Sequence, residues 1–364
     1  MHVYVHIPFC HRLCPYCAFY KHTPGATDMA GFVEGILCEA RLRIPEGSRP
    51  ETLYFGGGTP SMLSLRHFQS LMEGMAQYFD LGGLMEFSFE ANPATFTERK
   101  VEQWRQWGVN RVSLGVQSWE PRLLALLGRT HTPRQAEESI ALLRRLGIPQ
   151  VNIDLMFSLP GQSLAEWEET LVRTVELNPE HISAYNLTYE EDTEFFRRYG
   201  APASAEDEER DARKFERADE MLSQAGYRHY ETSNYARCNL LSRHNMAYWK
   251  GEDYYGLGPG AVGTVDGVRY RNSGDTRAYI DALRNGMRPP GEEERLTEED
   301  IRTERLGLYL RTDTGLPPAW IRPEDEPRVE TFIREGLAER FADGHVRLIG
   351  RGRLLVDAIA VELM

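Results

Sequence analysis

The sequence predicts an α/β protein built as a partial (β/α)6 barrel, followed by a small C-terminal domain with helices and a hairpin. Over the first 190 residues, short β-type runs alternate with longer helix-type runs. Strand–helix repetition of this kind implies a parallel sheet with helices packed outside. Six such units indicate an open version of the barrel. A doubly wound sheet has the same local pattern, but polar residues at the ends of many successive strands favour the barrel.

The predicted strands are short apolar runs, and the segments between them carry apolar residues at helical spacing. Phe32, Ile36 and Leu37, for example, recur at the spacing of one helix face. The strands are expected at residues 3–7, 52–55, 85–90, 111–116, 151–156 and 181–187.

A change of composition near residue 290 marks a domain boundary. Pro289 and Pro290 precede the run GEEE, which is typical of a linker. We therefore expect one domain over residues 1–290 and a second over residues 291–364. The first domain includes an acidic helix at residues 205–225, whose charges are most simply a solvated face.

The C-terminal domain combines helix-type segments with a hairpin signal, RFADGHVRLI, in which Asp343 and Gly344 form the turn. Helices around a hairpin resemble a winged-helix module. From Glu293 to the end there are 16 acidic and 11 basic residues, so a DNA-reading role is disfavoured. A lid or docking role is the better interpretation.

The composition narrows the class of protein. With 364 residues, the chain can form one large domain and a small one around a substantial core. Its net charge of −13 argues against a general affinity for nucleic acid. No apolar stretch approaches the ~20 residues that span a bilayer, which leaves at most a peripheral membrane contact. Five cysteines and a start without a signal-peptide pattern predict a cytoplasmic protein.

Three of the five cysteines, Cys10, Cys14 and Cys17, lie in the run CHRLCPYC. A cubane iron–sulfur cluster bound by three thiolates keeps one iron open for another molecule. Pro8 and Pro15 interrupt any helix, so the cysteines are expected on a loop after the first strand. The alternatives are a zinc site with a nearby histidine, or a redox-active thiol pair. Zinc sites usually have two separated ligand pairs, and no second Cys-x-x-Cys follows. The spacing therefore favours an iron–sulfur cluster.

The second predicted strand runs into YFGGGTPS, where Gly56, Gly57 and Gly58 let the backbone turn sharply and approach a ligand. Exposed backbone groups can hold a carboxylate, a phosphate or an amino group. Alone, three glycines after a strand fit a plain tight turn. Beside the cysteine loop, the three glycines become a candidate binding site for the ligand of the open iron.

Together, CHRLCPYC and GGGTP resemble the radical S-adenosylmethionine (radical SAM) superfamily. In that superfamily, the amino and carboxylate groups of S-adenosylmethionine (SAM) chelate the unique iron of a [4Fe–4S] cluster. The segments FEANP, RVSLGVQS, LGRTH, NIDLMFSLPGQ, HISAYNLTYE and RHNMAYW follow in the order seen in the oxygen-independent coproporphyrinogen III oxidase-like group. The likeness covers nearly the whole chain and is greatest to the heme chaperones of that group.

The resemblance implies a [4Fe–4S] cluster on the three cysteines and a set of residues around SAM. Taken singly, Glu90 and Asp154 also fit exposed strand ends. Arg129 also fits a surface ion pair, and Gln117 fits a helix cap. The residues that the resemblance assigns to SAM are Tyr4, Tyr16, Gly57, Gly58, Thr59, Glu90, Gln117, Arg129 and Asp154.

The resemblance also implies a heme site in the run RHNMAYW. It assigns the HNxxYW motif to heme binding, with His244 as the candidate ligand. Neutral imidazole is a common axial ligand of heme iron, and aromatic neighbours can stack on a porphyrin. From the residues alone, a histidine bonded to a backbone carbonyl beside Tyr248 and Trp249 fits as well. Cys38 and Cys238 receive no role.

Two features distinguish the chain from the decarboxylating oxidase of this group. That oxidase has a fourth cysteine two residues beyond the third, where this chain has Phe19. The chain also starts only three residues before Tyr4, which leaves no room for the oxidase's N-terminal extension. We therefore expect a chaperone that binds heme, a [4Fe–4S] cluster and SAM, and delivers heme to an acceptor hemoprotein. The alternative is a radical SAM enzyme, either an oxygen-independent coproporphyrinogen III dehydrogenase or a methyltransferase.

Overall fold

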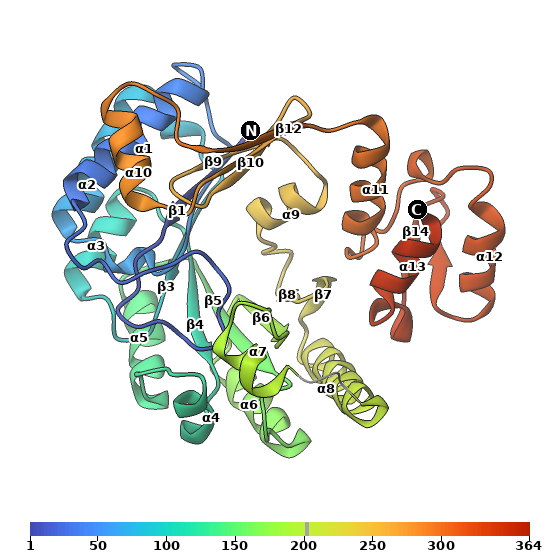
Figure 1. The fold of residues 1–364 in the computed structure, drawn as a ribbon. Coiled ribbons are helices and arrows are strands. Elements are labelled where there is room, and N and C mark those ends of the chain that lie inside the picture. The colour runs from blue at the N-terminus through green and yellow to red at the C-terminus, as the bar shows by residue number, and fades with distance from the viewer. Residues whose placement is uncertain (201–203) are drawn as a thin grey trace.

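The computed structural model describes residues 1–200 and 204–364. Its centre is a twelve-stranded sheet that curves around helix α9 (Arg243–Trp249) in Figure 1. Six neighbouring strands are parallel and stand in chain order, which confirms the predicted barrel units. They are β1 (His2–Ile7), β2 (Thr52–Gly57), β3 (Glu86–Ala91), β4 (Arg111–Gln117), β5 (Gln150–Phe157) and β6 (His181–Asn186).

Helices that follow the parallel strands cover the convex face of the sheet, as Figure 1 shows. The end strands of the sheet do not pair with each other within the described residues, so the barrel is open as predicted. The covering helices are α1 (Met29–Arg43), α2 (Leu65–Tyr78), α3 (Glu98–Gln106), α4 (Pro121–Leu126), α5 (Pro133–Arg145) and α6 (Leu164–Glu176).

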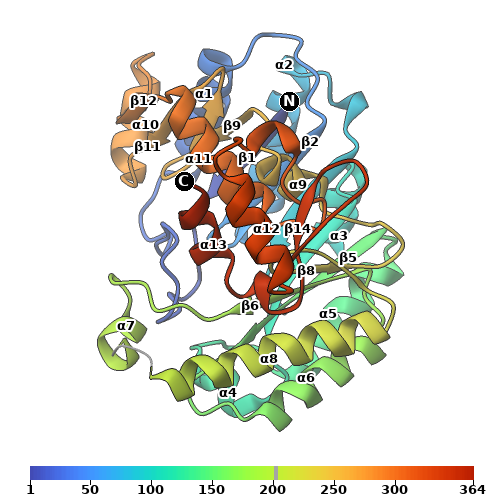
Figure 2. The same ribbon diagram turned by 90° about the vertical axis from the view of Figure 1, so that its right-hand side faces the viewer.

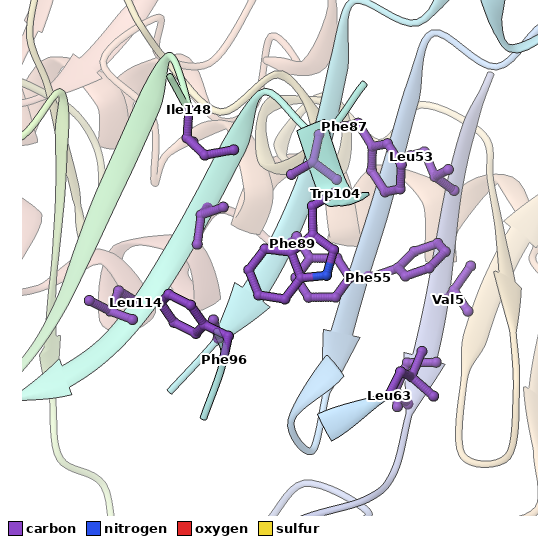
Figure 3. Packing of buried hydrophobic residues seen from close by; sticks show 14 of the residues in the cluster. Val5, Leu53, Phe55, Leu63, Phe87, Phe89, Phe96, Trp104, Leu114 and Ile148 are labelled. Carbon is purple, nitrogen blue, oxygen red and sulfur yellow. The ribbon is translucent and has the colours of Figure 1, made fainter. Parts of the chain in front are cut away.

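The alternation of side chains along each strand separates an apolar outer face from a polar inner face. On the outer face, Phe55 of β2 and Phe89 of β3 pack against the helices, and the Phe89 ring centre lies 4.5 Å from that of Trp104 in α3 (Figure 3). On the inner face, the Tyr54 hydroxyl donates a hydrogen bond to Glu90 Oε1 at 2.8 Å. The hydrophobic core therefore lies between sheet and helices, and the concave side is left for polar groups.

The sheet is extended at both edges by later parts of the chain. Strand β8 (Asn234–Ala236) pairs antiparallel with β6, and β9 (Tyr254–Leu257) pairs parallel with β1. Helix α8 (Ala205–Gln224) confirms the predicted acidic helix. No helix among the described residues combines the length and apolar character needed to cross a membrane. The added elements are α7 (Glu194–Tyr199), β7 (Arg228–Glu231), β8 (Asn234–Ala236), β9 (Tyr254–Leu257), β10 (Val262–Val265), β11 (Val268–Asn272) and α10 (Thr276–Arg284).

The run GEEE is a strand and not the linker that the sequence suggested. Strand β12 (Gly291–Arg295) pairs antiparallel with β11 at one end of the sheet. All five of its residues are exposed, and charged side chains are a common device for protecting an edge strand. Because charged residues have a low β-propensity, the sequence pattern did not indicate a strand here. The expected domain boundary at 290/291 thus falls just before the last strand of the large sheet.

The C-terminal helices and hairpin form a separate cluster with its own core, which faces the viewer in Figure 2. Leu306, Val329 and Ile359 are buried in this core. The hairpin confirms the predicted turn, since Gly344 adopts a positive φ of 86° between the two strands. The likeness to a winged helix stays a prediction. The elements are α11 (Glu298–Tyr309), α12 (Glu326–Arg334), β13 (Ala338–Arg340), β14 (Val346–Leu348) and α13 (Val356–Leu363).

Candidate functional site

The C-terminal ends of the parallel strands open into a cavity of about 630 Å³, here called the mouth cavity. Parallel strands bring their carboxyl ends to one edge, which is where barrels gather ligand-binding groups. Most of the residues expected to bind the cluster or SAM line this cavity. They are Cys10, Cys14, Tyr16, Cys17, Gly57, Gly58, Thr59, Glu90, Gln117, Arg129 and Asp154.

The cysteine loop follows β1 and forms one wall of the mouth cavity. Cys10 is buried, its backbone N–H donates to the His22 carbonyl at 3.0 Å, and its Sγ accepts from the Thr59 hydroxyl at 3.5 Å. Burial raises the pKa of the Cys10 thiol. All five cysteines of the chain are free thiols.

The donor set on this wall fits a [4Fe–4S] cluster better than a single metal ion. No three or more His, Cys, Asp or Glu side chains of the described residues are arranged to hold one metal ion. A cubane instead spreads its thiolate ligands over separate irons. Three cysteines line the cavity, and the other two, Cys38 and Cys238, are not among its lining residues. A cluster held by Cys10, Cys14 and Cys17 would keep one iron open, and it supplies one-electron chemistry when bound.

The glycine turn after β2 packs directly on the cysteine loop. A Cβ at Gly58 would lie 2.7 Å from the carbonyl carbon of Pro8 and 2.9 Å from the amide nitrogen of Phe9. Gly57 has a positive φ of 109°, and a Cβ there would lie 2.5 Å from the His6 ring. The glycines therefore let β2 approach the chain that carries the cysteines, a requirement that the sequence did not reveal.

Two carboxylates stand on the inner face at the mouth. Glu90 accepts hydrogen bonds from the Tyr54 hydroxyl at 2.8 Å and from the Gly57 N–H at 3.0 Å. Burial, reinforced by the charge of Asp154, raises the pKa of Glu90 to about 7. Asp154 accepts from the Ser113 hydroxyl at 3.0 Å, and burial raises its pKa as well. Fixed carboxylates of this kind can accept charge-assisted hydrogen bonds from an ammonium group or from sugar hydroxyls.

A buried arginine connects the cysteine loop to the strand ends. Arg129 donates to the Asn92 Oδ1 at 2.6 Å and to the Tyr16 hydroxyl at 2.7 Å. The Asn92 amide in turn donates to the Thr59 hydroxyl at 3.0 Å. Sequence reasoning missed Asn92, although it follows Glu90 by two residues in FEANP. Arg129 Nε is buried without a partner among the described residues, and the residue lines the mouth cavity.

The end of β4 carries backbone strain at Gln117. This residue has a positive φ of 68° and is buried, a combination that is uncommon for a residue with a side chain. Strained backbone of this kind often occurs where a site requires it. The conformation turns the chain directly at the mouth cavity, and the role of Gln117 in ligand contact stays a prediction.

Two expected cofactor residues lie outside the mouth cavity. Tyr4 bonds His6 Nδ1 at 3.0 Å and lines a second cavity of about 760 Å³, here called the side cavity. His244 is fully buried near the N-terminal ends of the strands, where its ring nitrogens bond Thr52 Oγ1 at 2.6 Å and the Tyr248 hydroxyl at 2.7 Å. Burial lowers the pKa of His244 to about 3, so its ring is neutral. His244 lines neither cavity, and its role as a heme ligand stays a prediction.

A partial barrel with three cysteines and a glycine turn at its mouth has the architecture of radical SAM proteins. Residues 4–173 match the Radical SAM superfamily. The chain is 35% identical to the heme chaperone HemW of Lactococcus lactis over 86% of this chain and 82% of the relative. It is 34% identical to HemW of Mycobacterium tuberculosis over 100% of this chain and 94% of the relative.

The fold agrees with these sequence relationships. The solved structure of the coproporphyrinogen III oxidase HemN from Escherichia coli superposes with a TM-score of 0.84 at 23% identity, covering 100% of this chain and 89% of HemN. This chain belongs to the radical SAM superfamily and, within it, to the family of the heme chaperone HemW. A [4Fe–4S] cluster and SAM are the cofactors of that superfamily, and the lining of the mouth cavity suits both.

Proposed function

We propose that this protein binds heme and passes it to an acceptor hemoprotein, on a scaffold that also holds a [4Fe–4S] cluster and SAM. The observation that carries the proposal is the relationship to proteins named heme chaperone HemW, which extends over the entire chain in the case of Mycobacterium tuberculosis. A relationship of this length includes the side cavity and the HNxxYW segment as well as the radical SAM part.

We place the cluster on Cys10, Cys14 and Cys17, and SAM across the rest of the mouth cavity. Arg129 supports this assignment, because it lines the mouth cavity and a guanidinium can donate to a carboxylate. The carboxylate of Glu90 can accept from hydroxyl or ammonium groups of the same ligand. The protein contributes orientation and exclusion of competing reactions, and the cofactors supply the radical chemistry.

A role as a heme carrier separates this protein from a porphyrinogen-oxidising enzyme. Phe19 stands where the resemblance places an extra cysteine in the decarboxylating oxidase, and its side chain is 71% exposed between the two cavities that it lines. An apolar side chain there offers no thiolate and can contact a hydrophobic cargo. We further propose that the protein works in the cytoplasm, where a reducing environment keeps its five thiols available.

The test is heme loading and transfer under anaerobic conditions. The protein is reconstituted with iron and sulfide, the cluster content is counted, and hemin is titrated in the presence and absence of SAM. We expect a stoichiometric heme complex that hands its heme to apomyoglobin faster than heme leaves it when apomyoglobin is replaced by buffer. Formation of protoporphyrinogen IX from coproporphyrinogen III with SAM and a reductant would overturn the proposal and assign the protein to the enzymes.

A further inference from the structure

The side cavity has the size and lining of a site for a flat aromatic ligand. Its volume of about 760 Å³ falls in the range of ligand pockets. It lies between strands β9 to β11, helix α11 and the end of the cysteine loop, and it shares Ala18 and Phe19 with the mouth cavity. Its aromatic lining residues are Tyr4, Phe19, Tyr20, Tyr248 and Tyr254.

One of these tyrosines begins a chain of side-chain hydrogen bonds. The Tyr248 hydroxyl bonds His244 Nε2 at 2.7 Å, and His244 Nδ1 bonds Thr52 Oγ1 at 2.6 Å. Thr52 Oγ1 bonds His2 Nδ1 at 2.8 Å, and His2 Nε2 bonds Glu252 Oε2 at 2.9 Å. Glu252 is half exposed and lines the side cavity, so the chain starts and ends at the same cavity.

For one tautomer of His2, the carboxylate end sets the direction of every hydrogen bond in this chain. A carboxylate oxygen accepts, so His2 donates through Nε2, and in the tautomer with that single N–H it accepts at Nδ1 from the Thr52 hydroxyl. Thr52 has then used its hydrogen and accepts from His244 Nδ1. His244 Nε2 is therefore the acceptor, and the Tyr248 hydroxyl points its hydrogen at His244. The Tyr248 oxygen keeps a further lone pair, and Tyr248 lines the side cavity.

We infer that Tyr248, and not His244, is the protein ligand to the iron of a heme bound in the side cavity, and that His244 is a positioning residue behind it. The inference rests on the proposed function and names the site of its cargo. Tyrosine is an established class of heme ligand. A Tyr248 ligand explains how the HNxxYW motif can take part in heme binding although the His244 ring lines neither cavity.

Charge balance favours Tyr248 over the second tyrosine–histidine pair of this cavity. When ferric iron bonds a phenol oxygen, one Fe–O bond forms, one O–H bond breaks and one proton leaves. From Tyr248 the proton passes to His244 and, by successive shifts along the chain, to the Glu252 carboxylate, with no change of oxidation state. Tyr4 donates to His6, whose other nitrogen ends on the Tyr20 carbonyl at 2.9 Å. A carbonyl cannot take up that proton, so it would remain on the buried His6 ring, whose pKa burial lowers.

The side cavity also offers a cation for the carboxylates of a porphyrin. Arg271 lines it, and its side chain makes no hydrogen bond or ion pair within the described part of the chain. Arg269, beside it, is already held by Glu304. Arg271 is therefore the group we expect to meet a heme propionate, since a guanidinium suits a carboxylate.

The experiment compares ferric-heme complexes of the reconstituted full-length protein. Tyr248→Phe removes the ligand oxygen and keeps the ring. Tyr255→Phe is the matched control, because Tyr255 lies on β9 but is not among the residues that line the side cavity. His244→Gln keeps a hydrogen-bonding side chain but no imidazole. Resonance Raman and electron paramagnetic resonance spectra report the axial ligand, hemin titration reports affinity, and the cluster spectrum and melting curve report folding.

We expect phenolate vibrations in the parent protein and in the Tyr255→Phe and His244→Gln variants, and their loss in Tyr248→Phe together with a roughly tenfold or greater loss of affinity. An imidazole-ligated spectrum that survives Tyr248→Phe and disappears in His244→Gln would overturn the inference. Phenolate vibrations lost only in Tyr4→Phe would overturn it as well. If the parent protein binds no heme, the proposed function fails instead, so the two failures are distinguishable.

Discussion

The mouth of the barrel and its opposite end, the floor, are built from similar residue types that are used differently. At the mouth, carboxylates and an arginine face a cavity, and Arg129 keeps a buried Nε without a partner in the described structure. At the floor, His2, Thr52 and His244 have their side-chain polar atoms hydrogen-bonded to one another or to neighbours. The mouth therefore presents polar groups to a cavity, whereas these groups of the floor are paired and hold the scaffold.

The hydrogen-bonded polar groups of the floor position helix α9. Glu86 accepts from the backbone N–H of Arg243 at 2.7 Å and of His244 at 3.2 Å, the first residues of α9. A carboxylate is favourable at a helix N-terminus, because it satisfies free N–H groups there. This contact fixes α9 inside the open barrel and with it the position of Tyr248. The floor therefore serves the side cavity indirectly, while the mouth offers its own groups to ligands.

The largest effect is expected from replacing the cysteines of the mouth. If these variants kept the cluster, the contrast between a ligand-binding mouth and a structural floor would not hold. Cys10→Ala, Cys14→Ala or Cys17→Ala should each abolish stable reconstitution, because a cubane that loses one of three protein ligands has two open irons. Iron and sulfide counts with the visible absorption spectrum measure this. Cys38→Ala and Cys238→Ala are the matched controls and should retain the cluster. Full reconstitution of a Cys10→Ala protein would contradict the assignment of the cluster to the cysteine loop.

A second variant tests whether the glycine turn supports the cysteine loop. A methyl group at Gly58 would press on the backbone of Pro8 and Phe9, which cannot rotate away. We expect Gly58→Ala to lower the free energy of unfolding by about 3 kcal/mol and to weaken cluster retention. Gly83→Ala is the control, because a Cβ there meets nothing within 4 Å. Urea unfolding of both proteins measures the difference, and equal midpoints would contradict the packing argument.

The sequence predicted the mouth better than the floor for a physical reason. Cys10, Glu90 and Asp154 can be recognised from their residue types and their positions at predicted strand ends. Parallel strands bring such residues together by topology alone. The role of His244 depends on partners 192 residues away, such as Thr52, which no local pattern reveals. The edge strand β12 was missed because its charged residues mimic a linker, and Asn92 because an amide after a strand has no signal of its own.

A third variant tests the floor directly. Thr52→Val preserves the shape of the side chain but leaves His2 Nδ1 and His244 Nδ1 without their shared partner. We expect a loss of about 2 kcal/mol of stability, the usual cost of a buried polar group left unpaired. Thr97→Val is the control, because this exposed helix cap makes no side-chain capping bond. The mouth should be spared, so SAM affinity measured by calorimetry should be unchanged in Thr52→Val. A weakened SAM affinity would show that floor and mouth are coupled.

The smallest expected effect is a pH dependence that originates at the mouth. Burial raises the pKa of Glu90 from 4.5 to about 7, so the folded cofactor-free protein holds this proton more tightly than the unfolded chain does. The stabilisation is fully present below pH 4.5 and is lost as the pH rises through about 7. Its size should be on the order of 1 kcal/mol, because part of the carboxylate faces the cavity, where water screens its charge. Glu90→Gln removes the titration and should flatten this part of the stability profile. Urea midpoints across the window measure it, and a slope identical to that of the parent protein would mean that Glu90 is already ionised at the mouth.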